Sequence, residues 1–477
     1  DWFRYLIASE QNYWDTMYSY IKDDLGYAGI VFGTIVANSP AGNQGRLDAV
    51  DSHFYWAHPV FPNNPWDPAD WYINETDTAV NSTVSHVGAF ARQRIAGKPF
   101  FNTEYQHVVP NKFSGEAPLI PAAYGAFQDW DGYWFFDYGS GADDWDRGYI
   151  SNYFSMDTDP ARMANVLLAA AMFRRGDVDP ARTSVTVGFD ADAQLDATLN
   201  GSAWSVGDGS HFGLSARHAF ETRVSLDPNA PFTSVPAGPT GDALTADTGQ
   251  LVWEQSAPNR GVVTVDTSRT KAVFGFAEER SVDLEGWVFT PGDTRMDWLT
   301  AGVTTVSGDS LDSAAGFRAL LIVTGERAST GWTWTDSAEN SLGNNWGSAP
   351  TLIEVVPLTL EVPHPADRVS AWALDATGAR LAALTIEATS AGAQINFGQN
   401  GDTLWYEIEV SADPSLTAPE IILHPGDRLV APGATTSLQV TAEGTAPLSY
   451  QWSHEGTPIT GATSATLQLL DVTAAAA

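Results

Sequence analysis

Helix-like and strand-like patterns alternate along the first 180 residues. Apolar residues at helical spacing predict helices over residues 1–25, 79–95, 117–130 and 160–175. Short apolar runs without that spacing predict buried strands over residues 29–36, 48–55, 99–105 and 132–138. Strands that alternate with helices indicate a parallel sheet with right-handed crossovers. Each strand run ends in polar or aromatic residues, so we expect those side chains to line one common edge.

From about residue 183 the helical periodicity disappears and short β-rich runs replace it. Turn residues separate these runs at intervals typical of a β-sandwich, and the clearest runs are 261–265, 270–276, 317–323, 369–374 and 403–408. A proline-bounded joint at 414–419 begins a last module, with strands expected over 421–425, 436–441, 448–452 and 465–469. Trp452 on the third of these strands is typical of an immunoglobulin-like core, and Val440 is expected in a place that a bridging cysteine often takes.

Composition narrows the possible partners. The formal net charge is −34, with 58 acidic against 24 basic residues, which argues against nucleic acid or an anionic membrane as a general partner. The absence of cysteine excludes disulfides, cysteine-ligated metals and thiol catalysis. No apolar run reaches the roughly 20 residues of a membrane span. The sequence opens directly into amphipathic helix, which we interpret as a mature or truncated secreted or cell-surface product.

The strongest chemical candidate is Glu104, which ends the run 99–105. A glutamate at the end of a buried strand is costly unless it is paired, so it is a candidate for chemistry rather than packing. The preceding strand ends in a His-x-Tyr pair, His53 and Tyr55, and the following one carries Trp134. Asp190 and Asp192 lack the ligand spacing of a calcium loop, and we predict no metal and no cofactor.

These motifs, His53-Phe54-Tyr55, Asn102-Thr103-Glu104-Tyr105 and the strand with Trp134, resemble the second half of a cellulase-like retaining glycoside hydrolase barrel of the clan-A type. The resemblance implies Glu104 as the catalytic nucleophile, His53 and Tyr55 as the pair that positions it, and Trp134 as the aromatic floor for the sugar. The region 245–411 is similar to the β-sandwich appended to such bacterial enzymes. The last module is similar to the Ig-like repeats of secreted bacterial proteins that degrade polysaccharides.

The implied fold class is therefore multidomain, α/β plus all-β. We expect the second half of a (β/α)8 barrel over 1–180, a β-rich region with a β-sandwich over 181–412, and a truncated Ig-like domain over 419–477. In the family the acid/base glutamate closes the fourth barrel strand, and the helix at 1–25 corresponds to the element after it. The acid/base is therefore expected upstream of residue 1. The chain is then a fragment, or another chain supplies the missing half, or catalysis is absent.

Further residues are expected to contact the sugar, namely Trp56, Asn102, His107 and Asp137. Asp137 either reaches the pocket or caps a loop, and the Trp-rich loop over 58–74 either builds subsites or packs on itself. The preferred hypothesis is a glycoside hydrolase that cleaves β-linked neutral poly- or oligosaccharide with retention. The alternatives are a non-catalytic carbohydrate-binding or cell-surface protein and an adhesin-like structural protein. The sequence does not predict the oligomeric state.

Overall fold

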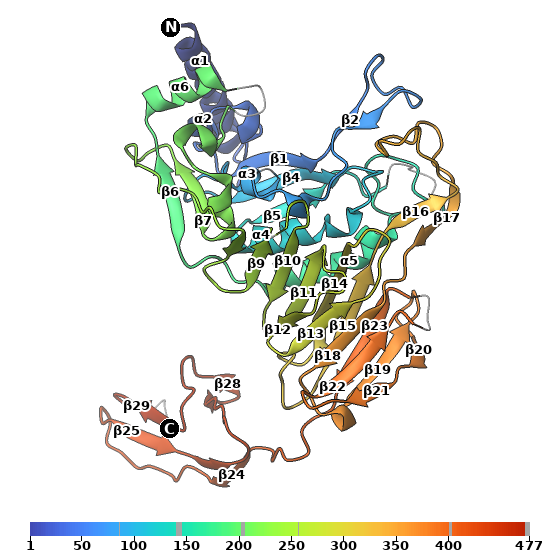
Figure 1. Cartoon of the computed structure of the whole chain (residues 1–477). Helices are drawn as coiled ribbons and strands as arrows, with labels where there is room; N and C mark the ends of the chain where they lie inside the picture. The colour runs from blue at the N-terminus through green and yellow to red at the C-terminus, as the bar shows by residue number, and fades with distance from the viewer. Residues whose placement is uncertain (85, 140–145, 202–205, 256, 400–402, 473–477) are drawn as a thin grey trace. The chain divides into compact units, whose positions relative to one another are not determined.

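The computed structural model describes residues 1–84, 86–139, 146–201, 206–255, 257–399 and 403–472 (Figure 1). It divides into two compact units, Asp1–Asp312 with Phe317–Val410, and Ser313–Gly316 with Ser411–Ala477. The chain mixes a few helices with many strands, and most of the sheets are antiparallel. The expected combination of α/β structure with β-sheets is confirmed at this level, whereas the barrel assignment stays a prediction.

The first unit contains a three-stranded sheet of β1 (Val50–Trp56), β4 (Phe100–His107) and β5 (Gly132–Phe135). The order is β1-β4-β5 and both pairs are parallel, which confirms the predicted parallel arrangement. The helices α3 (Val87–Ala91), α4 (Leu119–Phe127) and α5 (Pro160–Phe173) belong to the same buried core as this sheet. The Asp159 side chain caps α5 by accepting bonds from the backbone N–H groups of residues 161 and 162, and Pro160 begins the helix.

Two predicted elements differ from the structure. Residues 29–36 were expected as a buried strand, but they form no strand, and Ile30 and Phe32 are exposed. A backbone hydrogen bond from Asp48 N to Val31 O joins this segment to the residues before β1. In the described residues no further bonds extend this contact into a strand pair. The helix predicted over 79–95 is broken into a turn at Ala79–Asn81 and the short α3. A run of apolar residues is therefore not sufficient to predict a strand, because an irregular segment can have the same composition.

The predicted N-terminal helix is confirmed as α1 (Trp2–Ser19), followed by a π-helical turn at Tyr20–Asp24. None of its residues is buried. Polar contacts hold it to the rest of the unit: Arg46 donates two bonds of 2.8 Å to Asp15, and Tyr18 donates one of 2.7 Å to Asp48. None of the described helices has the length and apolar character that crossing a bilayer requires.

Helical structure continues beyond residue 183, contrary to the expectation. The strands β6 (Ser184–Gly188) and β7 (Arg223–Asp227) pair in parallel, and α6 (Ala191–Asn200) lies between them in the sequence. Asp190 is the N-cap of α6, accepting bonds from the N–H groups of residues 192 and 193. Its place in the sequence reflects helix capping. Helix α6 is only 10 residues long and contains two aspartates, so its helical pattern does not stand out from the surrounding sequence.

Two antiparallel sheets follow and pack face to face. The larger has the order β20-β19-β23-β15-β14-β11-β10-β9-β8, and the smaller β12-β13-β18-β22-β21. Their bounds are β8 (Ala243–Thr245), β9 (Leu251–Glu254), β10 (Val262–Asp266), β11 (Thr270–Gly275), β12 (Val282–Leu284), β13 (Trp287–Pro291), β14 (Leu299–Ser307), β15 (Phe317–Thr324), β18 (Leu358–Val362), β19 (Val369–Leu374), β20 (Arg380–Ala383), β21 (Ile386–Ala388), β22 (Ala393–Phe397) and β23 (Trp405–Val410). The five β-rich runs predicted from the sequence are all strands of the larger sheet.

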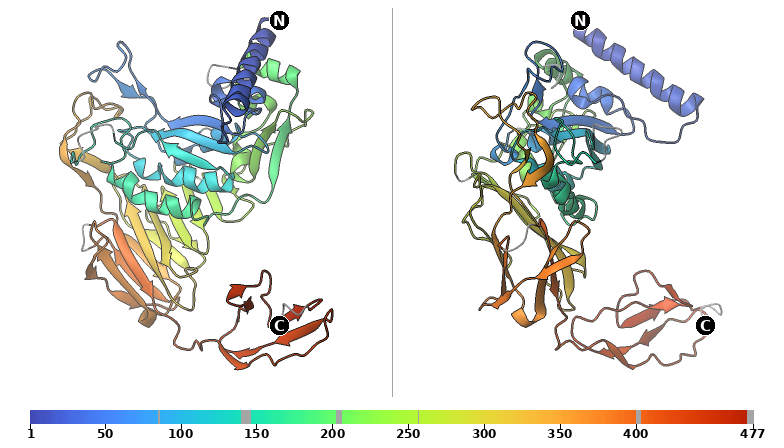
Figure 2. Two further views of the ribbon diagram at one scale, coloured as in Figure 1. Left: turned by 180° about the vertical axis from the view of Figure 1, so that it is seen from behind. Right: turned by 90° about the vertical axis from the view of Figure 1, so that its right-hand side faces the viewer.

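The central strands of the larger sheet are buried on both faces. Residues such as Leu321 share one core with Trp287 and Phe289 of the smaller sheet. On its other face Trp253 belongs to the core formed with α4 and α5. Helix α5 approaches the sheet so closely that a Cβ on Gly302 would lie 2.8 Å from Leu168 Cδ1. Figure 2 shows α4 and α5 between the parallel sheet and the β-sandwich, which therefore supports the parallel sheet through these helices.

Two hairpins complete the first unit near the carboxyl end of β1. The first pairs β2 (Pro59–Val60) with β3 (Tyr72–Ile73), and the second pairs β16 (Arg327–Thr330) with β17 (Ser348–Ile353). They share a small aromatic core that includes Trp71 and Phe154.

Up to residue 472, where its description ends, the second unit has three two-stranded sheets. Its strands are β24 (Glu420–Leu423), β25 (Thr436–Gln439), β26 (Thr441–Glu443), β27 (Ser453–His454), β28 (Thr457–Pro458) and β29 (Thr466–Leu469). Val440 is buried, as the sequence predicted. Trp452 is half-buried and lies outside the strands, where its indole N–H donates to Ser464 O at 2.8 Å, so the predicted strand over 448–452 is wrong. Two backbone bonds, from Trp452 N to Ala462 O and from Ile459 N to Trp452 O, hold this residue together with the indole bond.

Candidate active site

The candidate site lies where β1 and β4 run side by side on the face of the sheet that the helices leave uncovered. His53 is opposite Glu104 in the register, and the pairing skips Thr103, which marks a bulge in β4. Phe54 and Tyr105, whose rings are 4.6 Å apart, point to the helix side. The extra residue lets Thr103 and Glu104 both turn to the open side, because a bulge shifts the alternation of side chains.

Glu104 is held by two residues of the neighbouring strand. The Tyr55 hydroxyl donates to Glu104 Oε2 at 2.7 Å, and His53 Nδ1 lies 3.3 Å from the same oxygen. Burial, and then the Glu104 carboxylate, raise the pKa of Tyr55 well above its ordinary value, so the phenol keeps its proton and acts as a donor. The Glu104 side chain remains 36 % exposed. The predicted grouping of these three residues is therefore present in the structure.

The second nitrogen of His53 faces another carboxylate. His53 Nε2 lies 3.0 Å from Thr103 Oγ1 and 3.5 Å from Asp51 Oδ2. Thr103 in turn donates to both oxygens of Asp51, from its hydroxyl at 2.7 Å and its backbone N–H at 3.1 Å. His53 is thus placed between two carboxylates, and among the described residues the basic side chain beside Glu104 is a histidine rather than an arginine. Glu104 is positioned without being neutralised by a strong cation.

Aromatic side chains surround this network on the open face. Trp134 is 51 % exposed and its ring lies 5.7 Å from that of Phe101. Phe136 is also exposed and lies 5.9 Å from Tyr55. Exposed aromatic rings beside a carboxylate are suited to stacking on the apolar face of a sugar. The position of Trp134 agrees with the aromatic floor that the resemblance implies, although the role itself stays a prediction.

Three residues expected to contact the ligand are buried instead. Trp56 donates its indole N–H to Asp77 O at 2.9 Å on the helix side, and its ring meets His107 edge-on at 6.4 Å. Asn102 and His107 have no exposed surface. This placement corrects the expectation that Trp56, Asn102 and His107 touch a ligand at the site. Each has a polar group and lies near His53, Tyr55 or Glu104 in the sequence. Strand alternation turns Trp56 away from Tyr55, and the bulge at Thr103 turns Asn102 away from Glu104.

Asp137 follows the carboxyl end of β5 and is half-buried. Burial, reinforced by the charge of Asp157, raises the pKa of Asp137 above its ordinary value. Its backbone carbonyl accepts a bond of 3.3 Å from Gln106 Nε2. A role for Asp137 toward substrate stays a prediction.

A buried charge network, which the sequence did not reveal, supports the end of β4. Asp159 lies 2.9 Å from Arg327 Nε and 3.3 Å from Arg162 Nε, and all three side chains are fully buried. Arg162 also donates to Gln106 Oε1 at 3.1 Å and to the backbone carbonyl of His107. Burial raises the pKa of Asp159, but the two guanidinium groups outweigh it and hold that pKa below its ordinary value. The Asp159-Pro160 pair signalled a helix start, yet nothing local signalled the arginines.

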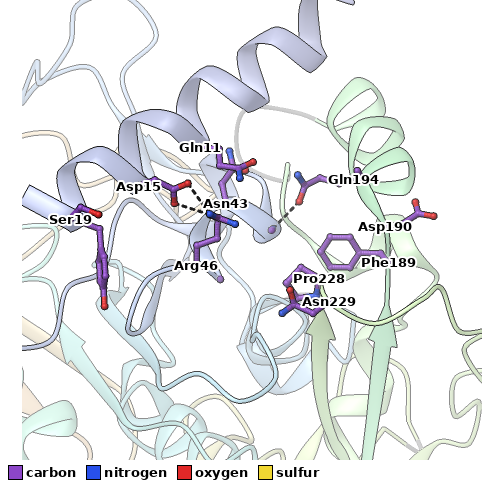
Figure 3. Close-up of a pocket in the computed structure, with 14 residues that line it drawn as sticks. Gln11, Asp15, Ser19, Asn43, Arg46, Phe189, Asp190, Gln194, Pro228 and Asn229 are labelled. Atoms are coloured by element: carbon purple, nitrogen blue, oxygen red, sulfur yellow. Dashed lines mark hydrogen bonds and ion pairs between the residues drawn. The ribbon is translucent and has the colours of Figure 1, made fainter. Parts of the chain in front are cut away.

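A separate polar hollow of about 610 Å³ lies between α1, the short helix α2 (Ala41–Gln44) and the start of α6 (Figure 3). Gln194 Oε1 accepts a bond of 2.8 Å from Gly42 N at its wall, and Arg46 is engaged by Asp15. Glu104 is not among its lining residues. The volume of this hollow therefore does not make it the candidate active site. We assign that site to the ends of β1 and β4, where the titratable side chains His53, Tyr55 and Glu104 lie together.

Within the described ranges, no group of three or more His, Asp or Glu side chains is arranged to hold a metal ion. Comparison of the chain with models of protein families, with curated proteins and with solved structures finds no match.

Proposed function

We propose that the chain is a secreted or cell-surface glycoside hydrolase that cleaves β-linked neutral poly- or oligosaccharide with retention of configuration. In this proposal β1, β4 and β5 are consecutive strands of a (β/α)8 barrel, and Glu104 is the nucleophile. The observation that carries the proposal is the Glu104 carboxylate, which accepts a 2.7 Å bond from Tyr55 on an open, aromatic-lined sheet face.

The bonding around Glu104 suits a nucleophile. The carboxylate attacks the anomeric carbon and forms a glycosyl ester, while the leaving oxygen takes a proton from a general acid; water then hydrolyses the ester. Tyr55 remains a phenol and orients the attacking carboxylate by hydrogen bonding. Asp51 accepts two bonds from Thr103 and lies beside His53, so it orients His53 and leaves the acid role to another group. We assign that role to none of the described residues.

The substrate class follows from charge and from the exposed rings. The net charge of −34 disfavours polyanionic chains, and the exposed face of Trp134 offers stacking that needs no charge. Neutral sugars meet both conditions. Because such polymers lie outside cells, the proposal includes secretion or surface attachment.

A non-catalytic carbohydrate-binding protein is the second candidate. The observation that favours it is that Glu104 is the one open carboxylate on the described strands β1 and β4, since Asp51 is buried and retaining hydrolysis requires two carboxyl groups about 5–5.5 Å apart. In this case Glu104 and His53 would accept and donate hydrogen bonds to sugar hydroxyls without bond cleavage.

Chemical rescue separates the two candidates. Wild-type protein is assayed for reducing-end release on neutral β-linked polysaccharides, and the anomer of the first product is read by NMR. Glu104→Ala should lose turnover and recover part of it with azide, giving a glycosyl azide of inverted configuration, because azide replaces the missing carboxylate. Binding without any product release would support the second candidate. Unchanged turnover in the variant would remove Glu104 from the mechanism.

A further inference from the structure

The loop over 61–71, between β2 and β3, projects beyond the carboxyl end of β1 (Figure 1). Trp66 lies on this loop with 65 % of its surface exposed, and its backbone has a positive φ of 62°. Most of the apolar surface of Trp66 stays in water, although its ring contacts Phe61. A tryptophan is therefore the least expected residue type at this position unless it has an external partner.

The loop is well supported, so the exposure of Trp66 is a property of an ordered segment. Asn63 Nδ2 donates to Asp70 Oδ2 at 2.7 Å, and Ala69 N donates to Asp67 Oδ1 at 3.0 Å. At the base, Trp71 stacks on Trp346 with centroids 5.4 Å apart. Trp71 packs into the protein and is buried, as expected for a Trp-rich loop that packs on itself, whereas Trp66 contacts Phe61 of the loop and leaves most of its ring exposed.

A continuous series of aromatic contacts joins Trp66 to the Glu104 site. Trp66 lies 5.0 Å from Phe61, which lies 5.8 Å from Tyr153. Tyr153 lies 6.3 Å from Phe154, which lies 6.0 Å from Tyr55, the residue that holds Glu104. Phe154 is buried, so this series fixes the place of Trp66 relative to the Glu104 site, several rings away and farther than a single sugar residue spans.

The chemistry of the loop selects a neutral, hydroxylated partner. Residues 61–71 contain two aspartates and no lysine, arginine or histidine, so an anionic ligand or an anionic membrane meets repulsion. The exposed amides of Asn63 and Asn64 lie in the same loop and are able to bond hydroxyl groups. A flat aromatic face together with amides matches a pyranose, whose faces are apolar and whose rim is polar.

We infer that Trp66 is a distal stacking platform for a neutral carbohydrate chain whose other end occupies the Glu104 site. The substrate is then an extended chain rather than a mono- or disaccharide, and Trp66 determines specificity for length. This inference rests on the proposed function and adds the substrate class to it.

Calorimetric titration of Glu104→Gln, which binds without turnover, tests the inference with cello-, manno- and xylo-oligosaccharides, each as disaccharide and hexasaccharide. Adding Trp66→Ala should weaken hexasaccharide binding about tenfold and leave disaccharide binding unchanged, with Trp66→Phe intermediate. Trp2→Ala is the matched control, because Trp2 is also 65 % exposed but lies on α1. It should change neither affinity.

Four results would overturn the inference. Equal affinity of Trp66→Ala and its parent for the hexasaccharide would remove the platform while leaving the proposed function in place. An equal loss for both lengths would show a role at the Glu104 site itself. A loss of self-association in Trp66→Ala, without a change in sugar affinity, would assign the exposed ring to a protein contact. Failure of every sugar to bind the parent would instead contradict the proposed function, and this inference with it.

Discussion

The two sides of the parallel sheet place similar residue types in different surroundings. On the open side, Glu104 is 36 % exposed and is bonded by Tyr55. On the helix side, His107 and Glu116 are fully buried, and the 3.9 Å between His107 Nε2 and Glu116 Oε1 is too long for a hydrogen bond. Burial lowers the pKa of His107 and raises that of Glu116 to about 8. The buried pair is therefore uncharged at neutral pH, and the charge available to a ligand lies on the open side.

The largest expected effect separates the two glutamates by activity. Glu104→Gln should lower kcat at least about a thousandfold, because an amide is not a nucleophile, and should leave the midpoint of thermal unfolding unchanged. Glu116→Gln, corrected for the folded fraction, should retain most of the turnover. Steady-state kinetics with circular dichroism on both variants makes the comparison. Similar turnover losses in the two variants would contradict the assignment of chemistry to the open side.

The next effect concerns the charge network beneath β4. Asp159→Asn keeps a cap for α5 but leaves Arg162 and Arg327 buried without their counter-charge, so it should lower the free energy of unfolding by about 3–5 kcal/mol. Urea unfolding of the first unit, followed by tryptophan fluorescence, measures it. The control is Arg4→Ala, which breaks the exposed Arg4–Asp192 pair and should cost less than about 1 kcal/mol. A loss as small as the control's would show that the network does not support the fold.

The third effect is a pH dependence on the helix side. In the folded protein the Glu116 carboxyl has a pKa of about 8, against an ordinary value of 4.5. Its contribution to stability is therefore fully present below about pH 4.5 and is lost as the pH rises toward 8, because the unfolded chain ionises first. Relative to Glu116→Gln, the wild type should lose up to about 1.4 kcal/mol per pH unit in this window. Urea unfolding at several pH values measures the free energy of unfolding of both proteins. If this free energy changed with pH in the same way in both, Glu116 would not be buried and protonated.

The smallest effect tests the positioning of the nucleophile. Tyr55→Phe removes a hydrogen bond to a charged group, which is worth about 1.5–3 kcal/mol, so kcat should fall about ten- to hundredfold. KM should change less, because the phenol holds Glu104 rather than the sugar. Tyr5→Phe on the exposed face of α1 serves as the control. A larger change in KM than in kcat would place the Tyr55 hydroxyl on the substrate instead.

The sequence predicted well those features that depend on local pattern. The strands β1, β4 and β5 and the helix α5 with its Asp159 cap follow from apolar runs and their polar ends. The grouping of His53, Tyr55 and Glu104 was expected from the resemblance to glycoside hydrolases. The apolar run at 29–36 failed because strand formation requires a neighbouring chain with free backbone groups, which a single run does not specify. Helix α6 was missed because its apolar positions are few.

The side on which a residue faces was harder to predict. Asn102 and Glu104 are two residues apart, which in a regular strand puts them on the same face. The bulge at Thr103 separates them, so that Asn102 is buried and Glu104 is open. The residues 159, 162 and 327 are distant in the sequence, and only the tertiary fold brings their charges together. Such long-range pairs leave no local pattern.

The central claim is that the carboxylate of Glu104 forms a covalent bond with the sugar. Mechanism-based labelling tests it directly: the protein is incubated with activated 2-deoxy-2-fluoro glycosides of the sugars that it cleaves, and the labelled peptide is mapped by mass spectrometry. The account predicts a single added glycosyl group on Glu104, absent from Glu104→Gln. A label on another carboxylate, or turnover with inversion and no label, would contradict it.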